Sequence, residues 1–371
     1  MHISRAVVAA SMAGVAAAGP RFIMYYDQWH TTTLSKDVTA GITHVMTSFA
    51  NPAIFTTDPP GDPTMFVDSA TLRPSFDSGT KICLAIGGWG TTDGFTTGQK
   101  TQATRELFAK NVNKVLEDHD YDCVDVDWEY PGGNGEDYKR NPNLNKIDEI
   151  DNYPLLLQAI KDEIGDKELS IAVPGREVDF IAFTPEKVPA ISKAVDIITV
   201  MTYDLMNRRD NETNHHSSVQ GSLETVEKYL DLGMDAAKMN LGIAFYAKFF
   251  QTAETCTGPI GCETAVLEDE DGADTMRSGA KTFMDGFEAR GLGRADGTEG
   301  GQWYWDPSTS YFWTWDTPDF IAQKFDKIVK AKGLGGVSAW SLGEDSSDHT
   351  YIKAIRKGLK TLSSCSKARR S

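Results

Sequence analysis

Long apolar runs and basic charge are both scarce in this sequence. Beyond residue 18, no stretch reaches the roughly 18 consecutive apolar residues that a membrane-spanning helix needs, so no membrane anchor is expected there. The 53 acidic residues outnumber the 37 lysines and arginines, and the net charge is −16. Such a surface repels nucleic acid and anionic membranes. We expect a neutral or cationic substrate, and nothing calls for a cofactor, a metal or a partner subunit, so a monomer is expected.

The chain begins with a segment that is typical of secretion. Residues 1–18 combine one basic residue, Arg5, with an alanine-rich apolar run that ends in small residues. This pattern predicts a signal peptide cleaved near Ala18, and a disordered N-terminus is the alternative. Asn211 opens the triplet Asn-Glu-Thr, an N-glycosylation sequon that fits a secreted, extracellular protein.

Cysteine is sparse, and its count of five is odd. Cys256 and Cys262 bracket a Thr-Gly-Pro-Ile-Gly loop, a spacing that predicts a local disulfide in an oxidising compartment. Cys83 and Cys123 lie in apolar, strand-like runs and are expected to be buried thiols. Cys365, in the polar tail, has no evident partner.

Eight short β-rich runs alternate with helix-like segments. The runs are Phe22–Tyr26, His44–Phe49, Ile82–Ile86, Cys123–Glu129, Leu169–Val173, Ile197–Tyr203, Asn240–Tyr246 and Gly336–Trp340. The helical segments include Gln102–Glu117, Asp148–Ile164, Ser222–Leu232 and Asp319–Lys332. This alternation argues for a parallel sheet covered by helices, and eight strands favour an α/β fold closed into a (β/α)8 TIM barrel. A doubly wound open sheet is the alternative, but no glycine-rich phosphate loop follows the first run.

One interval breaks the alternation. Residues 247–316 are far longer than a strand-to-helix loop needs, and they end in two aromatic runs around a Pro-Ser-Thr-Ser turn. We interpret them as a small α+β insertion with a β-hairpin. The hairpin's own core is expected to hold its tryptophans, Trp303, Trp305, Trp313 and Trp315. The barrel would then comprise residues 19–246 and 317–365, before a basic tail at 366–371.

The fourth run carries a row of acids, Asp122-Cys-Val-Asp125-Val-Asp127-Trp-Glu129. Side chains alternate between the two faces of a strand, so Asp125, Asp127 and Glu129 share one face. Apolar residues occupy the other face, which would contact the helices, so the acids must point into the barrel. Several carboxylates at close range cannot all be ionised, and at least one pKa must rise. Such a costly arrangement is typical of an active site.

Glu129 stands where this run ends, before Pro131 and two glycines. Barrel enzymes build their active sites at the C-terminal ends of the strands. We therefore expect Glu129 to be the proton donor and Asp127 the residue that holds it protonated. A solvated acidic edge and a metal site are the alternatives. The apolar residues between the acids argue against the first, and the absence of a nearby histidine argues against the second.

The acidic string resembles the signature of glycoside hydrolase family 18, the chitinases and their relatives. Three further segments resemble family motifs: Lys81–Gly88, Met201-Thr-Tyr203-Asp204 and Gly335–Trp340. Asn240–Phe250 and the insertion after it resemble the family's subgroup with a longer cleft. Two departures stand out. Ala85 replaces a serine that in relatives bonds the inner aspartate, and Ala247-Lys248 replaces Gly-Arg.

The resemblance implies a secreted chitinase that acts by substrate-assisted, retaining catalysis, in which the substrate's 2-acetamido group is the nucleophile. Asp127 would orient the acetamido N–H, Tyr203 would bond its carbonyl, and Asp125 would tune the pair from below. Trp340 would floor the cleaved subsite, with Met201 and Asp204 beside it. Asp204 is expected there only if its strand ends earlier, because alternation otherwise turns it away from Tyr203.

Other aromatic residues near strand ends are expected at the cleft, namely Tyr25, Trp29, Phe49 and Trp89, although ordinary packing explains them equally well. His215 and His216 are expected on a surface loop. Two other functions use the same fold: an endo-β-N-acetylglucosaminidase acting on glycoprotein glycans, and a chitin-binding lectin without catalysis. The four intact acids argue against the lectin.

Overall fold

The computed structural model describes residues 19–368, with side chains through residue 362. The expected signal peptide at 1–18, the end of the basic tail at 369–371 and the side chain of Cys365 lie outside this description. The last helix, α9 (Thr350–Ala368), extends into the segment expected to be a basic tail.

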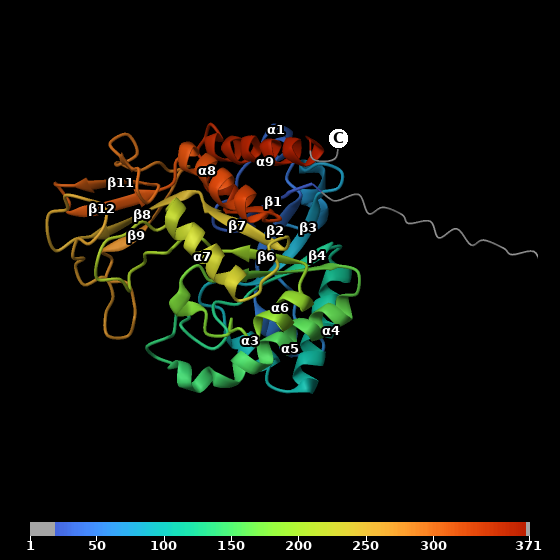
Figure 1. Ribbon diagram of the computed structural model, residues 1–371. Coiled ribbons are helices and arrows are strands. Elements are labelled where there is room, and N and C mark those ends of the chain that lie inside the picture. The colour runs from blue at the N-terminus through green and yellow to red at the C-terminus, as the bar shows by residue number, and fades with distance from the viewer. Residues whose placement is uncertain (1–18, 369–371) are drawn as a thin grey trace, which may run out of the picture.

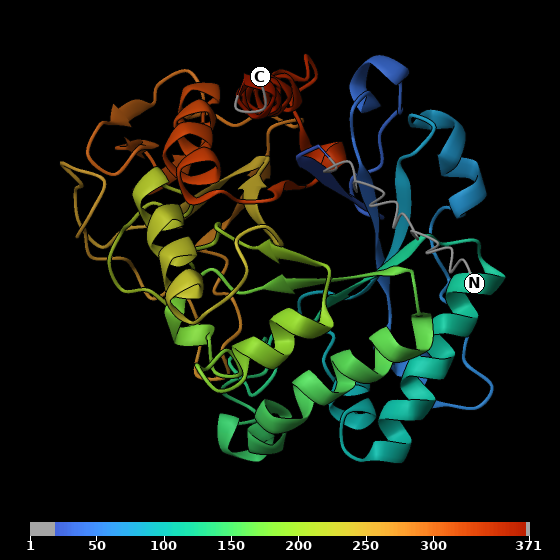
Figure 2. The same cartoon turned by 45° about the vertical axis from the view of Figure 1, so that its right-hand side comes forward.

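Eight parallel strands close into a barrel, which confirms the fold predicted from the alternation of strands and helices. The strands are β1 (Arg21–Asp27), β2 (His44–Ala50), β3 (Lys81–Gly87), β4 (Cys123–Asp127), β5 (Glu168–Val173), β6 (Ile197–Val200), β7 (Met239–Ala244) and β13 (Gly336–Trp340). They pair in chain order, and β13 closes the ring between β7 and β1. Figure 2 shows the helices arranged around the strands.

The longer helices cover the outside of the barrel. They are α4 (Gln102–Asp118), α5 (Ile147–Ile164), α6 (Val188–Ala194), α7 (Val219–Asp231), α8 (Pro318–Lys324), its π-helical continuation (Phe325–Lys330) and α9. Short helices lie in the loops: α1 (Lys36–Thr39), α2 (Ser69–Leu72), α3 (Asp93–Gly98) and 3-10 turns at Pro52–Thr56, Arg73–Ser75, Asn143–Lys146, Glu177–Asp179 and Leu342–Glu344. Thr317 caps α8 by accepting a hydrogen bond from the Phe320 amide, and Pro318 follows at the first helical position, where a missing N–H costs nothing.

The long interval after β7 forms a second sheet beside the barrel (Figure 1). Its antiparallel strands are β8 (Tyr246–Gln251), β9 (Ser278–Thr282), β10 (Arg294–Asp296), β11 (Gly301–Asp306) and β12 (Tyr311–Trp315), in the order β10-β11-β12-β8-β9. The predicted hairpin is β11 and β12. No helix lies between β8 and β12, a stretch that is described throughout. Trp303 and Trp305 pack on Phe312, whereas Trp313 and Trp315 join the main core.

Strand β4 separates two apolar layers, as alternation requires. Val124, Val126 and Trp128 belong to the core between strands and helices, where Trp128 stacks on Phe95 at 5.2 Å between ring centroids. Each fully buried side chain of this size contributes about 1.5–3 kcal/mol. Cys123, on the opposite face, lies inside the barrel.

The expectation that Cys83 and Cys123 are free thiols is wrong in this structure. The two residues face each other across β3 and β4, because the strands pair in register there. Their Cα atoms are 4.5 Å apart and the sulfurs are joined in a disulfide, which is within the range of Cα separations that disulfides adopt. The bond lies inside the barrel, two residues before Asp125 on β4.

Candidate active site

A cavity of about 650 Å³ opens at the C-terminal ends of the barrel strands. This is the end at which barrel enzymes build their sites, because the strand-to-helix loops converge there. Nine of the ten expected catalytic and substrate-binding residues line it: Tyr25, Phe49, Trp89, Asp127, Glu129, Met201, Tyr203, Asp204 and Trp340. Asp125 is fully buried beneath them. Trp29 also lines the cavity and is 62 % exposed.

The acidic row rises through the barrel from Asp125 to Asp127 and Glu129. Burial raises the pKa of Asp125 to about 6, although the hydrogen bond from Tyr25 opposes the shift. Burial also raises the pKa of Asp127, and the charges of Glu129 and Asp125 add to it. Carboxyl groups this close cannot all be ionised near neutral pH, so the row retains at least one proton.

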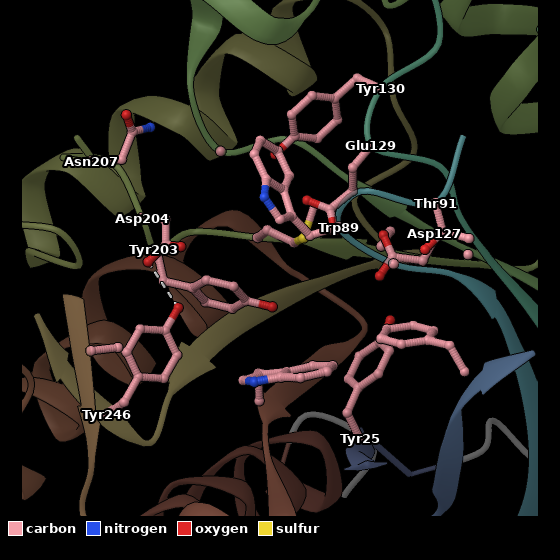
Figure 3. Close-up of a pocket in the computed structure, with 18 of the residues that line it drawn as sticks. Tyr25, Trp89, Thr91, Asp127, Glu129, Tyr130, Tyr203, Asp204, Asn207 and Tyr246 are labelled. Carbon is pink, nitrogen blue, oxygen red and sulfur yellow. Dashed lines mark hydrogen bonds between the residues drawn. The ribbon is translucent and has the colours of Figure 1, made fainter. Parts of the chain in front are cut away.

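Glu129 lies just beyond the last residue of β4 and is half-buried. Burial raises the pKa of its carboxyl group to about 8, against a hydrogen bond from Tyr130 and with the support of the charges on Asp204 and Asp179. A carboxyl group with that pKa is protonated at neutral pH and can donate its proton. Figure 3 shows Glu129, Asp127 and Tyr203 directed toward a common space.

Strand β6 ends at Val200, so Tyr203 and Asp204 follow it in a loop. Alternation does not apply there, which explains how both residues reach the cavity. Asp204 has a φ of +54°, a left-handed conformation that is uncommon outside glycine. Such strained backbone often accompanies function. Burial raises the pKa of the Tyr203 phenol well above its ordinary value, and the charge of Asp127 raises it further. The hydroxyl therefore stays protonated and able to donate.

Asp204 is surrounded by hydrogen-bond donors and positive charge. Tyr246 donates to its carboxylate at 2.9 Å (Figure 3), and the Lys248 ammonium lies 3.1 Å away. Burial alone would raise the pKa of Asp204, but Lys248 and His216 outweigh it and lower that pKa. Asp204 is thus a fixed negative charge.

The aromatic floor of the cavity is formed by residues near the ends of β13, β2 and β1. Trp340, at the end of β13, stacks on Phe49 at 5.6 Å between ring centroids with an interplanar angle of 12°. Tyr25 packs against the same indole at 5.6 Å. Trp89 is 45 % exposed and contacts the edge of Tyr130 at 6.3 Å. Flat, partly exposed rings of this kind stack on the apolar faces of sugar rings.

Several residues that line the cavity were not identified from the sequence. They are Tyr130, Arg176, Asp179, Asn207, Arg208, Arg209, Tyr246, Lys248 and Glu344. Asn207, Arg208 and Arg209 follow the Tyr-Asp motif within five residues, and this proximity was the available signal. Asp179 and Glu344 come from short turns after β5 and β13, where periodicity carries no information.

The expectation that His215 and His216 lie on a surface loop is wrong. Both are buried, because the segment after β6 packs under the insertion sheet. His215 pairs with Thr314 of β12 at 2.9 Å and with Asp296 at 3.3 Å. Burial lowers its pKa to about 4. These histidines join the insertion to the barrel and are not exposed.

The structure also shows where the expected modification sites lie. Cys256 and Cys262 are joined in a disulfide within the insertion. Asn211 is exposed on the loop after β6, where glycosylation would be sterically possible. Among residues 19–368, no cluster of three or more His, Cys, Asp or Glu side chains has the arrangement of a metal site. In the same range, no helix is long and apolar enough to span a bilayer.

Known proteins provide an independent comparison. The model of the glycosyl hydrolases family 18 matches residues 21–345. Chitinase 1 of Aphanocladium album is 27% identical over 302 residues, which cover 75% of this chain and 65% of the relative. Endochitinase 1 of Metarhizium robertsii is 28% identical over 286 residues, covering 71% and 62%. The chain therefore spans less than two thirds of the length of these curated relatives.

The fold is also similar to that of solved structures. A crystal structure of a chitinase from Rhizomucor miehei superposes with a TM-score of 0.74 at 21% identity, covering 91% of this chain and 99% of that one. At that identity the likeness speaks for the fold alone. The family match spans most of the sequence and includes the acidic row, the Tyr-Asp motif and the strand that ends in Trp340. The chain belongs to the glycosyl hydrolases family 18.

Proposed function

We propose that the protein is a chitinase that hydrolyses β-1,4 linkages between N-acetylglucosamine units by substrate-assisted, retaining catalysis. The observation that carries this proposal is the half-buried Glu129, whose pKa is raised to about 8, at the mouth of a cavity with an aromatic floor. The site offers one well-placed proton donor. Asp204, another carboxylate that lines the cavity, is engaged by Tyr246 and Lys248.

In the first step, the sugar over Trp340 supplies its own nucleophile. The acetamido carbonyl oxygen bonds to the anomeric carbon as the glycosidic C–O bond breaks, and Glu129 transfers its proton to the leaving oxygen. The product is an oxazolinium ion whose positive charge lies next to Asp127. The Tyr203 hydroxyl would hold the acetamido carbonyl in line for the attack. Such preorganised donors and charges usually supply the largest part of a rate enhancement.

In the second step, water attacks the anomeric carbon from the face that the leaving group vacated. Glu129, now a carboxylate, takes a proton from this water, and the oxazolinium ring opens to restore the acetamide. Asp125, which is buried beneath Asp127, keeps the Asp127 carboxyl group in position during both steps. The two displacements at one carbon each invert it, so the product keeps the β configuration. The same residue acts first as acid and then as base, as microscopic reversibility requires.

The sequence also supports a proposal for where the protein acts and in which oligomeric state. The apolar segment at 1–18, the sequon at Asn211 and the paired cysteines support a secreted protein, because disulfides persist in oxidising compartments. We propose that the enzyme acts outside the cell as a monomer, with chitin or its oligomers as the only partner, and without cofactor.

The proposal is tested by comparing two substrates of the same chemistry. Purified protein is incubated with N-acetylglucosamine hexamer and, separately, with a high-mannose glycopeptide, and the products are separated by chromatography. Cleavage of the hexamer with little or no release of the glycan is the expected result. Preferential release of the glycan would instead indicate an endo-β-N-acetylglucosaminidase, and binding of the hexamer without cleavage would indicate a lectin.

A further inference from the structure

A contact outside the reacting centre joins the barrel to the insertion. The loop after Glu129 meets the loop between β8 and β9. Tyr138 donates a 2.9 Å hydrogen bond to the carboxylate of Glu268, and Lys139 donates a 2.7 Å hydrogen bond to the carbonyl of Asp269. The Lys139 ammonium also lies 3.8 Å from Glu268. We call this contact between residues 138–139 and 268–272 the latch.

Two arginines stand between the latch and the cavity. Arg208 donates to the carbonyl of Gly272 at 3.2 Å and lies 4.0 Å from the Glu268 carboxylate. Glu268 is nearly buried, with a side-chain exposure of 7%, so its carboxylate faces these partners and not solvent. Arg208 and Arg209 line the cavity, whereas Tyr138 and Glu268 do not. The latch therefore lies behind the arginines and supports them.

Arg209 connects the latch to the catalytic loop. Its two terminal nitrogens donate 2.9 Å hydrogen bonds to the carbonyls of Asn134 and Gly135. Its guanidinium lies 4.0 Å from the centroid of the Tyr138 ring and 5.5 Å from that of Trp89. A planar cation between two rings is held more firmly than a surface lysine, through cation–π attraction and its fixed fork of donors.

The position of the proton donor indicates which side of the cleft Arg208 and Arg209 close. We call these two arginines the wall. Glu129 protonates the oxygen that leaves; with the reacting sugar over Trp340, the leaving sugar would lie on the other side of Glu129, toward Tyr130 and the exposed ring of Trp89. Figure 3 places Trp89, Tyr130 and Asn207 on that side of the cavity and Tyr25 on the opposite side. Arg208 and Arg209 follow Asn207 directly. The wall and the latch behind it consequently lie where a long leaving group would have to pass.

We propose that Arg208 and Arg209, supported by the latch, are specificity-determining residues that close the leaving-group side of the cleft and favour the release of short leaving groups. This inference rests on the proposed chitinase activity. Tyr25 lies on the opposite side of the cavity (Figure 3), and its ring and that of Phe49 pack against Trp340. A long chain would thus extend in that direction, and one or two units would depart past Trp89.

The position of cleavage in N-acetylglucosamine hexamer tests the inference. Hydrolysis in ¹⁸O-labelled water places the label on the newly formed reducing end, so mass spectrometry of a rapidly quenched sample separates leaving fragments from retained ones. We expect unlabelled leaving fragments of one and two units to exceed those of three or more by roughly tenfold, the discrimination that a single steric or contact difference provides. Equal amounts of short and long leaving fragments would overturn the inference.

Variants identify the residues responsible. Arg208→Ala opens the wall, and Tyr138→Phe removes one latch hydrogen bond but keeps the ring against Arg209. We expect both to lower the ratio of short to long leaving fragments, Arg208→Ala more strongly. Arg140→Ala is the matched control, because Arg140 pairs only with Glu136 on the same loop and does not line the cavity. Circular dichroism checks that each variant is folded.

The outcomes separate the two proposals. If the wild type does not cleave the hexamer at all, the proposed chitinase activity is wrong and the latch inference falls with it. If it cleaves the hexamer with a bias toward short leaving fragments that Arg208→Ala and Tyr138→Phe leave unchanged, the chitinase proposal stands and the role of the arginines is refuted.

Discussion

The phenol of Tyr25 donates a 2.9 Å hydrogen bond to the carboxylate of Asp125, deep in the barrel. Asp125 stands in register with Ala85 of β3 on one side and with Ser170 of β5 on the other. Ala85 cannot donate a hydrogen bond, and Tyr25 holds the inner aspartate instead. The acidic row can therefore keep its inner member in place without a hydroxyl at position 85 of β3.

The first prediction concerns the proton donor. Glu129→Gln keeps the shape of the side chain but removes the transferable proton. Because general acid catalysis contributes about 10²–10⁴-fold, we expect kcat on N-acetylglucosamine hexamer to fall by at least that factor. Binding of the hexamer, measured by calorimetry, should persist. Turnover near the wild-type rate would show that Glu129 is not the acid.

The second prediction concerns the hydroxyl that holds the acetamide. Tyr203→Phe keeps the ring in place but removes the donor. We expect kcat to fall by roughly 10²-fold, as when one preorganised donor is removed from an active site. The matched control is Tyr311→Phe, a tyrosine of the insertion whose ring packs on Phe249. If the two variants had equal rates, Tyr203 would have no role in the chemistry.

The third prediction concerns pH. The pKa of Glu129 is raised to about 8, and the acid must be protonated to act. The rate should therefore hold below that pH and fall as the pH rises through about 8. The charge of Asp204 raises the pKa of Glu129, and its removal leaves the positive charge of Lys248 unpaired. Asp204→Asn should thus move the alkaline limb of kcat/KM to lower pH by roughly one pH unit. A limb that stays in place or moves upward would contradict this assignment.

The fourth prediction concerns the two disulfides. Alkylation of the denatured, unreduced protein followed by peptide mapping should leave Cys83, Cys123, Cys256 and Cys262 unmodified. Replacing both Cys83 and Cys123 by alanine should lower the free energy of unfolding by roughly 2–4 kcal/mol, because the bond closes a loop of about 40 residues. Alkylation of Cys83 and Cys123 before reduction would show that they are free thiols.

The periodic features of the sequence predicted the fold and the centre of the site. Alternating strands and helices specified the barrel, and the spacing of two placed Asp125 and Asp127 on the inner face of β4, with Glu129 just beyond its end. These inferences succeed because strand geometry is local and repeats along the chain. Periodicity does not fix the position of the motif after β6, because that position depends on where the strand ends.

Contacts between distant segments could not be predicted in this way. The pairing of Cys83 with Cys123 depends on the register of β3 against β4, and the burial of His215 depends on how the insertion folds back on the barrel. The latch joins residues that are 130 positions apart. None of these relationships leaves a periodic trace in the sequence, because each is fixed only when the whole chain has packed.

The nucleophile is the central claim, and the configuration of the first product tests it most directly. Attack by the acetamido group followed by attack of water inverts the anomeric carbon twice. Proton NMR of N-acetylglucosamine hexamer during the first minutes of hydrolysis should therefore show the β-anomer of the new reducing end first, with the α-anomer appearing later by mutarotation. An inverting enzyme would need a second carboxylate positioned across the site to activate water. Initial release of the α-anomer would contradict substrate-assisted catalysis, even if Glu129 proved essential.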